Sequence, residues 1–442
     1  MKRLFFIIFL PVIAVGAMWS QGQSEGMRKL SLADFAITNL YVDEVDENKL
    51  VEDAIRGMLD KLDPHSTYTT AEETREMNEP LQGNFSGVGI QFNMNKDTLY
   101  VIQTIVGGPS EKVGILAGDR IIAVNDTTIA GVKMKNTDIM KRLRGESGTV
   151  VRVTVLRKGV KEPIEFRIVR DKIPIYSIDA SYMADKETGY IRVSRFAVTT
   201  DKEFSDAIKE LKKKGMKNLI VDLQGNGGGF LTSAIAMADE FLADGQSIVY
   251  TEGRRSPRDD AFASKRGQFQ KGKLVLLVDE SSASASEILS GAIQDWDRGI
   301  IVGRRTFGKG LVQRPIPFPD GSMIRLTVAR YYTPSGRSIQ KPYDKGHEAY
   351  ERELLDRFNH GELIYTDSIH FPLQFQTLKS KRTVYGGGGI MPDIFIPLDT
   401  TIYTDFHRDL LAKGVLNQYP VNYLDSHRKE LMNKYKKVDQ FV

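Results

Sequence analysis

The sequence predicts an α/β protein with a β-rich module in front of its core. From about residue 171 onward, short apolar runs of strand character alternate with stretches whose apolar residues recur at helical spacing, which is the pattern of an α/β domain. Residues 83–170 instead contain short strands and turns, and residues 26–80 are helical in pattern. We therefore expect an α/β core at 171–398 and a charged, partly helical segment at 399–442.

The first residues have the pattern of an export signal. Lys2 and Arg3 precede an uncharged run over residues 4–19, and small residues near Ala17 could serve as a cleavage site. We therefore assign residues 1–22 to a signal peptide and expect export to the periplasm. An uncleaved anchor, which would leave the protein membrane-associated, is the alternative, although a run this short is marginal for spanning a bilayer. After cleavage we expect no stable membrane span.

The region that follows is predicted to be helical. One stripe of apolar residues recurs at helical spacing and consists of Leu50, Val51, Ile55, Met58 and Leu59. The turn residues Asp63-Pro64-His65-Ser66 end this pattern.

Residues 83–170 are arranged as in a PDZ domain, with candidate strands and one helix in the following order: 87–92, 101–102, 118–125, the helix 136–143, and 150–157. Such a module binds an extended peptide as an added strand and holds its terminal carboxylate on backbone N–H groups. The candidate binding residues are Ser86, Gly87, Val88, Gly89 and Ile90, with a helix wall formed by Ile139, Met140 and Leu143. The alternative is a small sandwich that only packs against the next domain.

The core is predicted from eight elements in chain order: strand 190–195, helix 202–213, strand 218–223, helix 231–242, strands 247–250 and 274–278, helix 284–296 and strand 300–302. In open α/β sheets, sites form where strands end and helices begin. Two candidate segments lie at such junctions.

A serine-rich run, Ser-Ser-Ala-Ser-Ala-Ser-Glu at 281–287, joins a strand to a helix. The Ala285 N–H in the first helical turn could donate to an oxyanion. A second donor could come from the glycine-rich loop 222–229, where Gly228 is the candidate. Both features have plainer explanations, because serine is common at helix N-caps and glycine in turns. The residues alone do not choose among Ser281, Ser282, Ser284 and Ser286.

Lys309 is the candidate base for a serine nucleophile. A free lysine has a pKa of about 10.4 and must be desolvated to act as a base near neutral pH. Its neighbours are apolar, and no acidic residue lies between Gly299 and Phe318. In an extended chain Gln313 would share its face and could orient the amine. The segment 303–310 also resembles a phosphate-binding loop, but Gly310 stands where that loop needs Ser or Thr.

These motifs together resemble the carboxyl-terminal processing (tail-specific) proteases, in which Ser-Ala-Ser-Ala-Ser-Glu carries the nucleophile and Thr-Phe-Gly-Lys-Gly the base. Further matches lie at 331–340 and 386–393. The resemblance implies that Ser284 is the nucleophile, Lys309 the base and Gln313 the orienting residue. It also implies a ClpP/crotonase-type core with an inserted PDZ domain.

The sequence departs from the family in one loop. Where the family has Asp-Leu-Arg-x-Asn-Pro-Gly-Gly, this chain has Gln224 for Arg and Gly227 for Pro. The departure leaves the geometry of the loop, and which glycine donates, open.

Composition excludes several other functions. The 61 basic and 57 acidic residues leave a net charge of +4, too small to argue for nucleic-acid binding. Without cysteine there is no disulfide or thiol nucleophile. His347-Glu348 lacks the second histidine of a zinc-protease helix. We expect no metal and no cofactor.

The sequence therefore predicts an exported serine endopeptidase that binds protein C-terminal tails through its PDZ domain and cleaves nearby through an acyl-enzyme. The rival hypothesis is a peptide-binding protein on the same scaffold with a vestigial site. The C-terminal segment is expected to pack on the N-terminal helices or on a second subunit, which would make the protein a homodimer.

Overall fold

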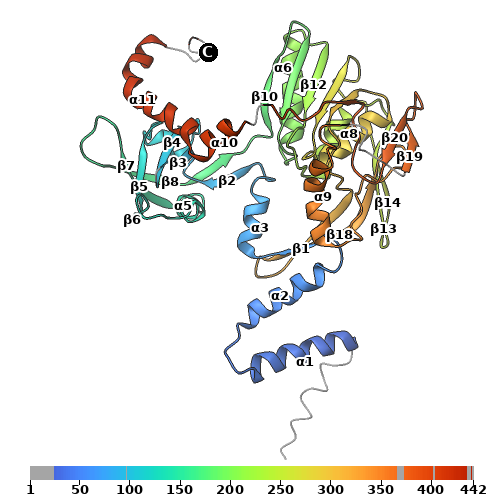
Figure 1. Ribbon diagram of the computed structural model, residues 1–442, viewed down its shortest axis with the longest axis horizontal. Coiled ribbons are helices and arrows are strands. Elements are labelled where there is room, and N and C mark those ends of the chain that lie inside the picture. The colour runs from blue at the N-terminus through green and yellow to red at the C-terminus, as the bar shows by residue number, and fades with distance from the viewer. Residues whose placement is uncertain (1–23, 96, 366–372, 402–403, 436–439, 441–442) are drawn as a thin grey trace, which may run out of the picture. The chain divides into compact units, whose positions relative to one another are not determined.

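The computed structural model describes residues 24–95, 97–365, 373–401, 404–435 and 440 (Figure 1). The predicted signal peptide, residues 1–22, lies outside the described residues. The chain divides into two compact units. The first combines Met1–Ala71 with Gln313–Thr327, and the second combines Glu72–Val312 with Val328–Val442.

The first unit holds two helices and a short strand. Ser24 caps the start of helix α1 (Glu25–Leu40) and Asp46 caps that of helix α2 (Glu47–Leu59), and each cap side chain accepts a backbone N–H of the first turn. Strand β1 (Thr67–Thr69) pairs with the first residues of β18 (Met323–Tyr332), with Thr67 opposite Arg325. The predicted helical region is therefore interrupted by a strand. Of the predicted stripe in α2, only Leu59 is buried.

Asp63 explains why helix α2 is followed by a turn. Its carboxylate accepts the N–H groups of His65 and Ser66, both at 2.9 Å. A side chain that takes up local N–H groups in this way competes with the helix and favours a turn.

The β-rich module of the second unit follows helix α3 (Ala71–Asn78). Its main sheet has the order β3 (Ile90–Asn95), β4 (Thr98–Thr104), β5 (Arg120–Val124), β7 (Val150–Leu156) and β8 (Ile164–Val169), with β6 (Thr127–Thr128) paired to β5. Helices α4 (Pro109–Lys112) and α5 (Asn136–Leu143) complete it, and β2 (Asn84–Gly87) pairs separately with β9 (Asp171–Pro174). In β7, Val151, Val153 and Val155 alternate into a fully buried core. Strand β3 forms one edge of the main sheet.

The α/β core of the second unit is built on a six-stranded sheet. Its order is β10 (Ile178–Met183), β11 (Thr188–Val193), β12 (Asn218–Asp222), β15 (Leu274–Val278), β16 (Ile300–Gly303) and β21 (Ile394–Phe395). Within this sheet, strands β11, β12, β15, β16 and β21 run parallel to one another, and β10 is antiparallel to β11. The helices are α6 (Thr200–Lys213), α7 (Leu231–Asp239) and α8 (Ala285–Asp295) (Figure 1). Every residue of α8 is buried, which places this helix inside the core.

The remaining elements lie outside this six-stranded sheet. A second sheet joins the last residues of β18 to β13 (Ser247–Gly253), which pairs with β14 (Ser256–Phe262), and β17 (Leu311–Pro317) also pairs with β18. Helix α9 (His347–Asn359), the hairpin of β19 (Leu373–Gln376) and β20 (Thr383–Gly386), and helices α10 (Asp405–Ala412) and α11 (Val415–Lys434) follow. Within the described ranges, no helix is both long and apolar enough to cross a membrane.

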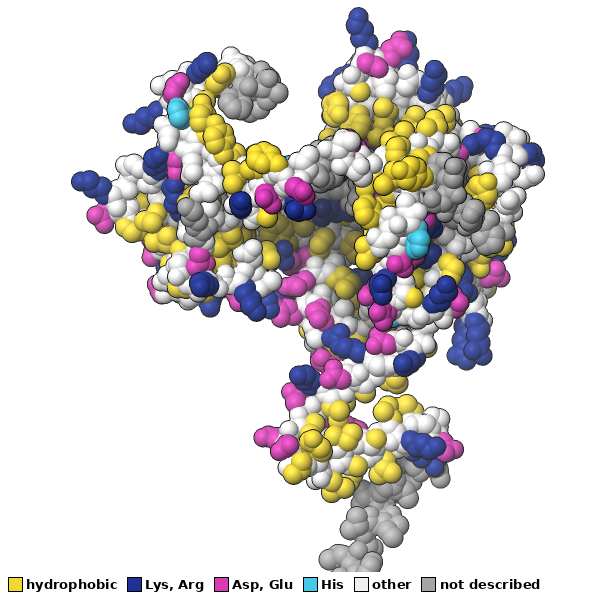
Figure 2. All heavy atoms as spheres, viewed as in Figure 1, with side chains coloured by type: hydrophobic (Ala, Val, Ile, Leu, Met, Phe, Trp, Pro, Cys, Tyr) yellow, Lys and Arg dark blue, Asp and Glu magenta, His cyan; other side chains and the backbone are white. Residues whose placement is uncertain are grey.

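Apolar side chains remain exposed on α1 and on α11, where they form visible patches (Figure 2). Among the most exposed are Leu32, Phe35, Tyr419 and Met432. The sequence suggested that the C-terminal segment packs on the N-terminal helices or on a second subunit.

The register of the parallel strands brings three loops to one sheet edge. Asp222 lies opposite Leu277, and Val278 opposite Gly303. The loops that follow β12, β15 and β16 therefore leave the carboxyl ends of adjacent strands, where α/β sheets place their sites.

Candidate active site

Ser284 stands immediately before helix α8 in an unusual backbone conformation, with φ 55° and ψ −111°. A non-glycine residue is strained in this region and persists only where the surrounding structure enforces it. Such strain gathers at functional sites. The geometry therefore distinguishes Ser284 from the other serines of the run.

Two of the three neighbouring serines have structural partners. The buried hydroxyl of Ser282 donates to the carbonyl oxygen of Leu223 at 2.8 Å, and the buried hydroxyl of Ser286 donates to that of Asn226 at 2.9 Å. These two bonds connect the serine-rich segment 281–287, called here the serine turn, to the glycine-rich loop after β12. Because both hydroxyls are enclosed and engaged, they are poorly placed to attack a substrate.

Glu287 links the serine turn to the lysine loop, which is the segment 304–310 between β16 and β17. Its Oε2 atom accepts the backbone N–H of Ser284 at 2.8 Å and that of Lys309 at 2.9 Å. Its Oε1 atom accepts the N–H of Gly308 at 2.7 Å and the hydroxyl of Thr306 at 2.5 Å. One carboxylate therefore holds Ser284 and Lys309 close together, although 25 positions separate them in the sequence.

The electrostatics of Glu287 follow from its burial. The side chain is fully enclosed, and burial raises the pKa of Glu287 to about 7 although its four hydrogen bonds favour the charged form. Those four donors fill the acceptor sites of an ionised carboxylate. Above neutral pH, Glu287 is therefore an anion that aligns the two loops.

Tyr331 connects the same two residues a second time. Its buried hydroxyl lies 3.2 Å from the carbonyl oxygen of Ser284 and also donates to the carbonyl oxygen of Lys309. Burial raises the pKa of Tyr331 well above its usual value, so the hydroxyl keeps its proton. Sequence reasoning gave no role to Tyr331 or Glu287, although both lie within the motifs it quoted.

The glycine-rich loop packs directly against the serine turn. Gly228 has φ +99°, and a Cβ atom there would lie 2.8 Å from Ser284 Cβ and 3.0 Å from the Ala285 nitrogen. Only glycine fits this approach. The Gly228 N–H, one predicted oxyanion donor, is engaged by Asn226 Oδ1 at 2.9 Å. Ala285, the other candidate, is the first residue of α8, so its N–H has no acceptor within the helix.

Gln313 lies in β17 and belongs to the first compact unit. Its side-chain amide donates to the carbonyl oxygen of His65. No sequence signal pointed to this contact, because His65 lies 248 positions away.

The candidate peptide-binding residues of the PDZ-like module extend from β2 to the start of β3. Ser86 and Gly87 lie in β2, whose register with β9 was not expected from sequence. The Val88 carbonyl accepts from Ser110, and the Gly89 carbonyl accepts the N–H of Ile105. Because N–H and C=O of one trans peptide point in opposite directions, the N–H groups of Gly89 and Ile90 point away from those partners.

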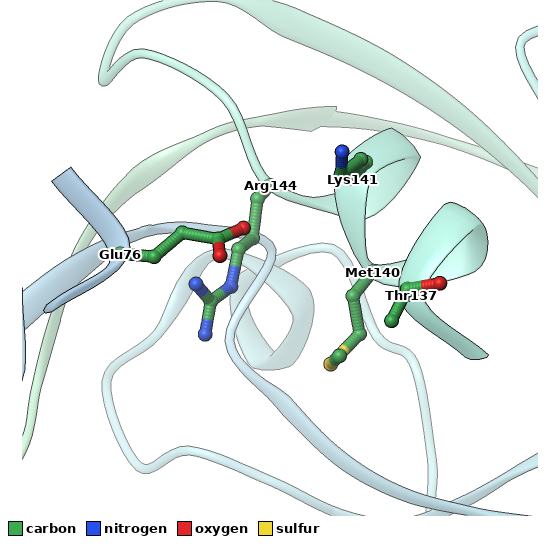
Figure 3. A pocket seen from close by; sticks show the side chains of 5 residues that line it. All are labelled: Glu76, Thr137, Met140, Lys141 and Arg144. Carbon is green, nitrogen blue, oxygen red and sulfur yellow. The ribbon is translucent and has the colours of Figure 1, made fainter. Parts of the chain in front are cut away.

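Helix α5 contributes differently to the groove than predicted. Ile139 and Leu143 are buried in the module's own core, whereas Met140 is exposed. Met140 faces a cavity of about 550 Å³ that is lined by Glu76, Thr137, Met140, Lys141 and Arg144 (Figure 3). The helical spacing alone did not show which side of α5 faces the core.

The cavity is flanked by ion pairs that join residues in or just after α5 to residues in or just after α3. Lys141 pairs with Glu72 at 2.9 Å, and Arg144 pairs with Glu79 at 3.2 Å. Over the described part of the chain, three or more His, Asp or Glu side chains nowhere gather as a metal site would require.

Family comparisons agree with this architecture. The peptidase family S41 model matches residues 187–346, and the PDZ domain model matches residues 86–168. The model of the activating protease CtpB N-terminal domain matches residues 15–74, and a family of unknown function matches residues 406–442.

Individual relatives extend the match. The Carboxy-terminal-processing protease of Bartonella bacilliformis is 40% identical over 308 residues, which cover 68% of this chain and 69% of the relative. The Carboxy-terminal processing protease CtpB of Bacillus subtilis is 34% identical over 384 residues, covering 85% and 79%. The solved photosystem II D1 C-terminal processing protease is 26% identical, with a TM-score of 0.44, covering 87% of this chain and 96% of that one.

The two family models and the relatives from Bartonella bacilliformis and Bacillus subtilis agree with one another. The chain therefore belongs to the carboxy-terminal processing proteases, the serine peptidases of family S41 that carry a PDZ domain.

Proposed function

We propose that Ser284 and Lys309 perform the peptidase chemistry as nucleophile and base in an acyl-enzyme mechanism. The observation that carries this proposal is the Glu287 carboxylate, which binds the backbone N–H groups of both residues. A shared anchor of this kind fixes the relative position of two groups that must exchange a proton. The strained backbone of Ser284 supports its assignment as the nucleophile.

The acylation step follows from these roles. The neutral amine of Lys309 takes the Ser284 hydroxyl proton while the Ser284 oxygen bonds to the substrate carbonyl carbon. The negative charge on the substrate oxygen would be stabilised by the Ala285 N–H and by Gly228 once its N–H turns from Asn226. The carbon–nitrogen bond then breaks, and the leaving amine takes the proton from Lys309. Gln313 would orient the Lys309 amine.

Deacylation repeats the step with water in place of the serine. Lys309 takes a proton from water as the oxygen attacks the acyl carbon, and then returns it to the Ser284 oxygen as the ester bond breaks. Because the amine must be neutral at each attack, activity should rise with pH through an apparent pKa between roughly 6 and 9.

The PDZ domain is proposed to recruit substrates by their C-terminal tails. Strand β3 lies at an edge of the sheet, so an extended peptide could add beside it. The N–H groups of Gly89 and Ile90 would hold the terminal carboxylate, with Val88 completing the turn after Ser86 and Gly87. Amidating the terminus of a good peptide substrate should therefore weaken its binding.

Export to the periplasm is also proposed, because a charged start and an apolar run resemble a secretory signal. Cell fractionation with mass spectrometry of the mature N-terminus tests this. Homodimer formation is proposed through the exposed apolar faces of α1 and α11. Light scattering on the purified protein would report its mass.

The catalytic proposal is tested with a fluorescent phosphonate probe that labels activated serines. Wild-type protein should be labelled, with the adduct on Ser284 by peptide mass spectrometry. Ser284→Ala and Lys309→Ala should both remain folded and unlabelled. Label on Ser281, or a fully reactive Lys309→Ala variant, would overturn the assignment.

The same probe distinguishes the enzyme from the rival hypothesis of a non-catalytic peptide-binding protein. A folded wild-type protein that binds a C-terminal peptide but never reacts with the probe would be a peptide-binding protein with a vestigial site. The engaged and enclosed contacts of Glu287 favour the enzyme, because a vestigial site has no need to bury a carboxylate at this cost.

A further inference from the structure

A buried ion cluster lies behind the loop that carries Lys309. Arg305 forms a two-point contact with Glu362, with nitrogen–oxygen distances of 2.5 and 2.8 Å. The same guanidinium contacts Glu353 of α9 at 3.0 Å. Arg305 thus connects the start of the lysine loop to α9 and to the turn after it.

Arg357, also on α9, binds the backbone of the lysine loop. It donates to the carbonyl oxygen of Arg305 at 2.6 Å and to that of Thr306 at 3.2 Å. Its Nε atom contacts Glu362 at 2.9 Å, which fixes the orientation of the guanidinium. The planar fork of arginine suits this task, because it can reach two carbonyls at once.

Lys341 contacts the two loop residues that directly precede Lys309, Phe307 and Gly308. Its amine lies 4.1 Å from the ring centres of both Phe307 and Tyr350, and it pairs with Glu353 at 3.0 Å. Its backbone N–H donates to the carbonyl oxygen of Gly308 at 2.9 Å. Each residue from 305 to 308 is therefore held by this cluster.

The cluster is deeply enclosed. Arg305, Arg357 and Lys341 expose only 9, 3 and 3% of their side chains. Burying charges is costly, and apolar packing of equal volume is often as stable. Buried networks that persist in spite of this cost can specify one geometry.

The contacts from α9 lie outside the part of the chain that matches the family model. That match ends at residue 346, whereas α9 begins at His347. Tyr350, Glu353 and Arg357 all lie on α9. These contacts are thus supplied by a segment beyond the matched peptidase region.

We infer that α9 is a positioning element for the catalytic lysine, with Arg357 and Lys341 as the positioning residues. Glu353 and Glu362 hold these two cations. Arg357 then fixes the carbonyl groups of residues 305 and 306, while Lys341 holds the Phe307 ring with its amine and the Gly308 carbonyl with its backbone N–H. These contacts set where the Lys309 amine points. Neither Arg357 nor Lys341 is proposed to touch substrate. The inference rests on the proposed role of Lys309 as the base.

The test compares two arginines that do the same structural work in different places. Arg298 donates to the carbonyl oxygens of Phe241, Gly272 and Phe269 at 3.0, 3.0 and 2.6 Å. None of those residues is a candidate for catalysis. Arg357→Lys and Arg298→Lys therefore remove matched contacts, one at the lysine loop and one elsewhere.

Steady-state kinetics on a short peptide and probe-labelling rates at Ser284 are measured below the melting temperature of each variant. For Arg357→Lys we expect kcat to fall at least about tenfold with KM within about twofold, since a misplacement of 1 Å can cost about a hundredfold. Labelling should slow by the same factor. Arg298→Lys should lower the melting temperature but leave kcat unchanged.

Lys341→Met provides a second variant if Arg357→Lys does not fold, and it should lower kcat in the same way. A folded Arg357→Lys or Lys341→Met with wild-type kcat would overturn the inference, as would an equal loss in Arg298→Lys. If wild type fails to label at Ser284, or Lys309→Ala keeps full activity, the proposed function fails instead. The two failures are therefore distinguishable.

Discussion

The candidate protease site and the PDZ domain differ in how their hydrogen-bonding groups are used. At the protease site, one buried carboxylate takes four hydrogen bonds, and the two candidate catalytic residues share it. In the PDZ domain, strand β3 lies at the sheet edge and Met140 faces an open cavity. The acceptor sites of the first region are filled from within the protein, whereas the second region places a strand at the edge of a sheet.

The difference suits the function that we propose for each region. Proton transfer between a serine and a lysine depends on distances that must not vary, so burial and complete hydrogen bonding suit it. Binding tails of varied sequence relies on main-chain hydrogen bonds at an open edge. Substitutions should therefore affect turnover in the first region and binding in the second.

The largest effect is expected at Lys309. Lys309→Arg should reduce turnover as completely as Lys309→Ala, by at least about a thousandfold, because a guanidinium cannot be deprotonated in a protein. Peptide binding, measured by fluorescence anisotropy, should stay at the wild-type value. An active arginine variant would remove lysine from the mechanism.

A smaller but still large effect is expected at Glu287. Glu287→Gln presents an NH₂ group to N–H donors and leaves them unsatisfied, which costs roughly 1–3 kcal/mol for each buried group. We expect kcat to fall about a hundredfold and the melting temperature to drop.

Glu280→Gln is the matched control, because Glu280 lies in the same turn but contacts the Arg304 side chain at 2.6 Å. It should keep most of the wild-type turnover. Equal losses in both variants would show that the serine turn needs negative charge nearby rather than the shared anchor at Glu287.

The pH dependence of stability gives a third, moderate effect. The pKa of Glu287 is about 7 in the folded protein, above about 4.3 for an unfolded glutamate. Between these values the folded state binds more protons than the unfolded state, so this residue's contribution to stability grows as pH falls and is lost as pH rises through about 7.

Urea unfolding at pH 8 and pH 5 checks this sign. The stability of wild type relative to Glu287→Gln should be greater at pH 5 than at pH 8. A relative stability that is lower at pH 5 would indicate that the four hydrogen bonds outweigh burial and that the carboxylate stays charged.

The smallest effect is expected in the PDZ groove. Gly89 has φ +73°, and a Cβ atom there would lie 2.9 Å from Ile173 Cδ1, so Gly89→Ala strains the turn. A Cβ atom at Gly87 would meet its nearest neighbour, Phe85 Cε2, at 3.3 Å. Gly89→Ala should weaken peptide binding several-fold, about 1 kcal/mol, and Gly87→Ala should do so less.

Turnover of a short peptide that does not reach the PDZ domain should be unchanged in both glycine variants. Titration calorimetry with a C-terminal peptide and kinetics with the short substrate measure the two properties separately. A loss of short-peptide turnover in Gly89→Ala would contradict the division of work between the two regions.

Local pattern was enough to predict most elements. The helix at 136–143 and the strand at 274–278 were predicted with the bounds that the structure shows. The α/β core, the PDZ module and the serine and lysine loops also follow from the sequence, because apolar periodicity and short motifs depend on near neighbours. The same reasoning overlooked β1, because its partner strand β18, where Arg325 lies opposite Thr67, is distant in the chain.

Only the tertiary structure decided how these pieces meet. It made Glu287 the common acceptor for Ser284 and Lys309, and it brought Glu362 to Arg305 across 57 positions. It also buried the Ile139 side chain in the PDZ core, although the helix itself was predicted correctly. Such contacts depend on loop paths and side-chain directions that chain-local pattern does not encode, so a sequence names the reacting residues more readily than those that hold them in place.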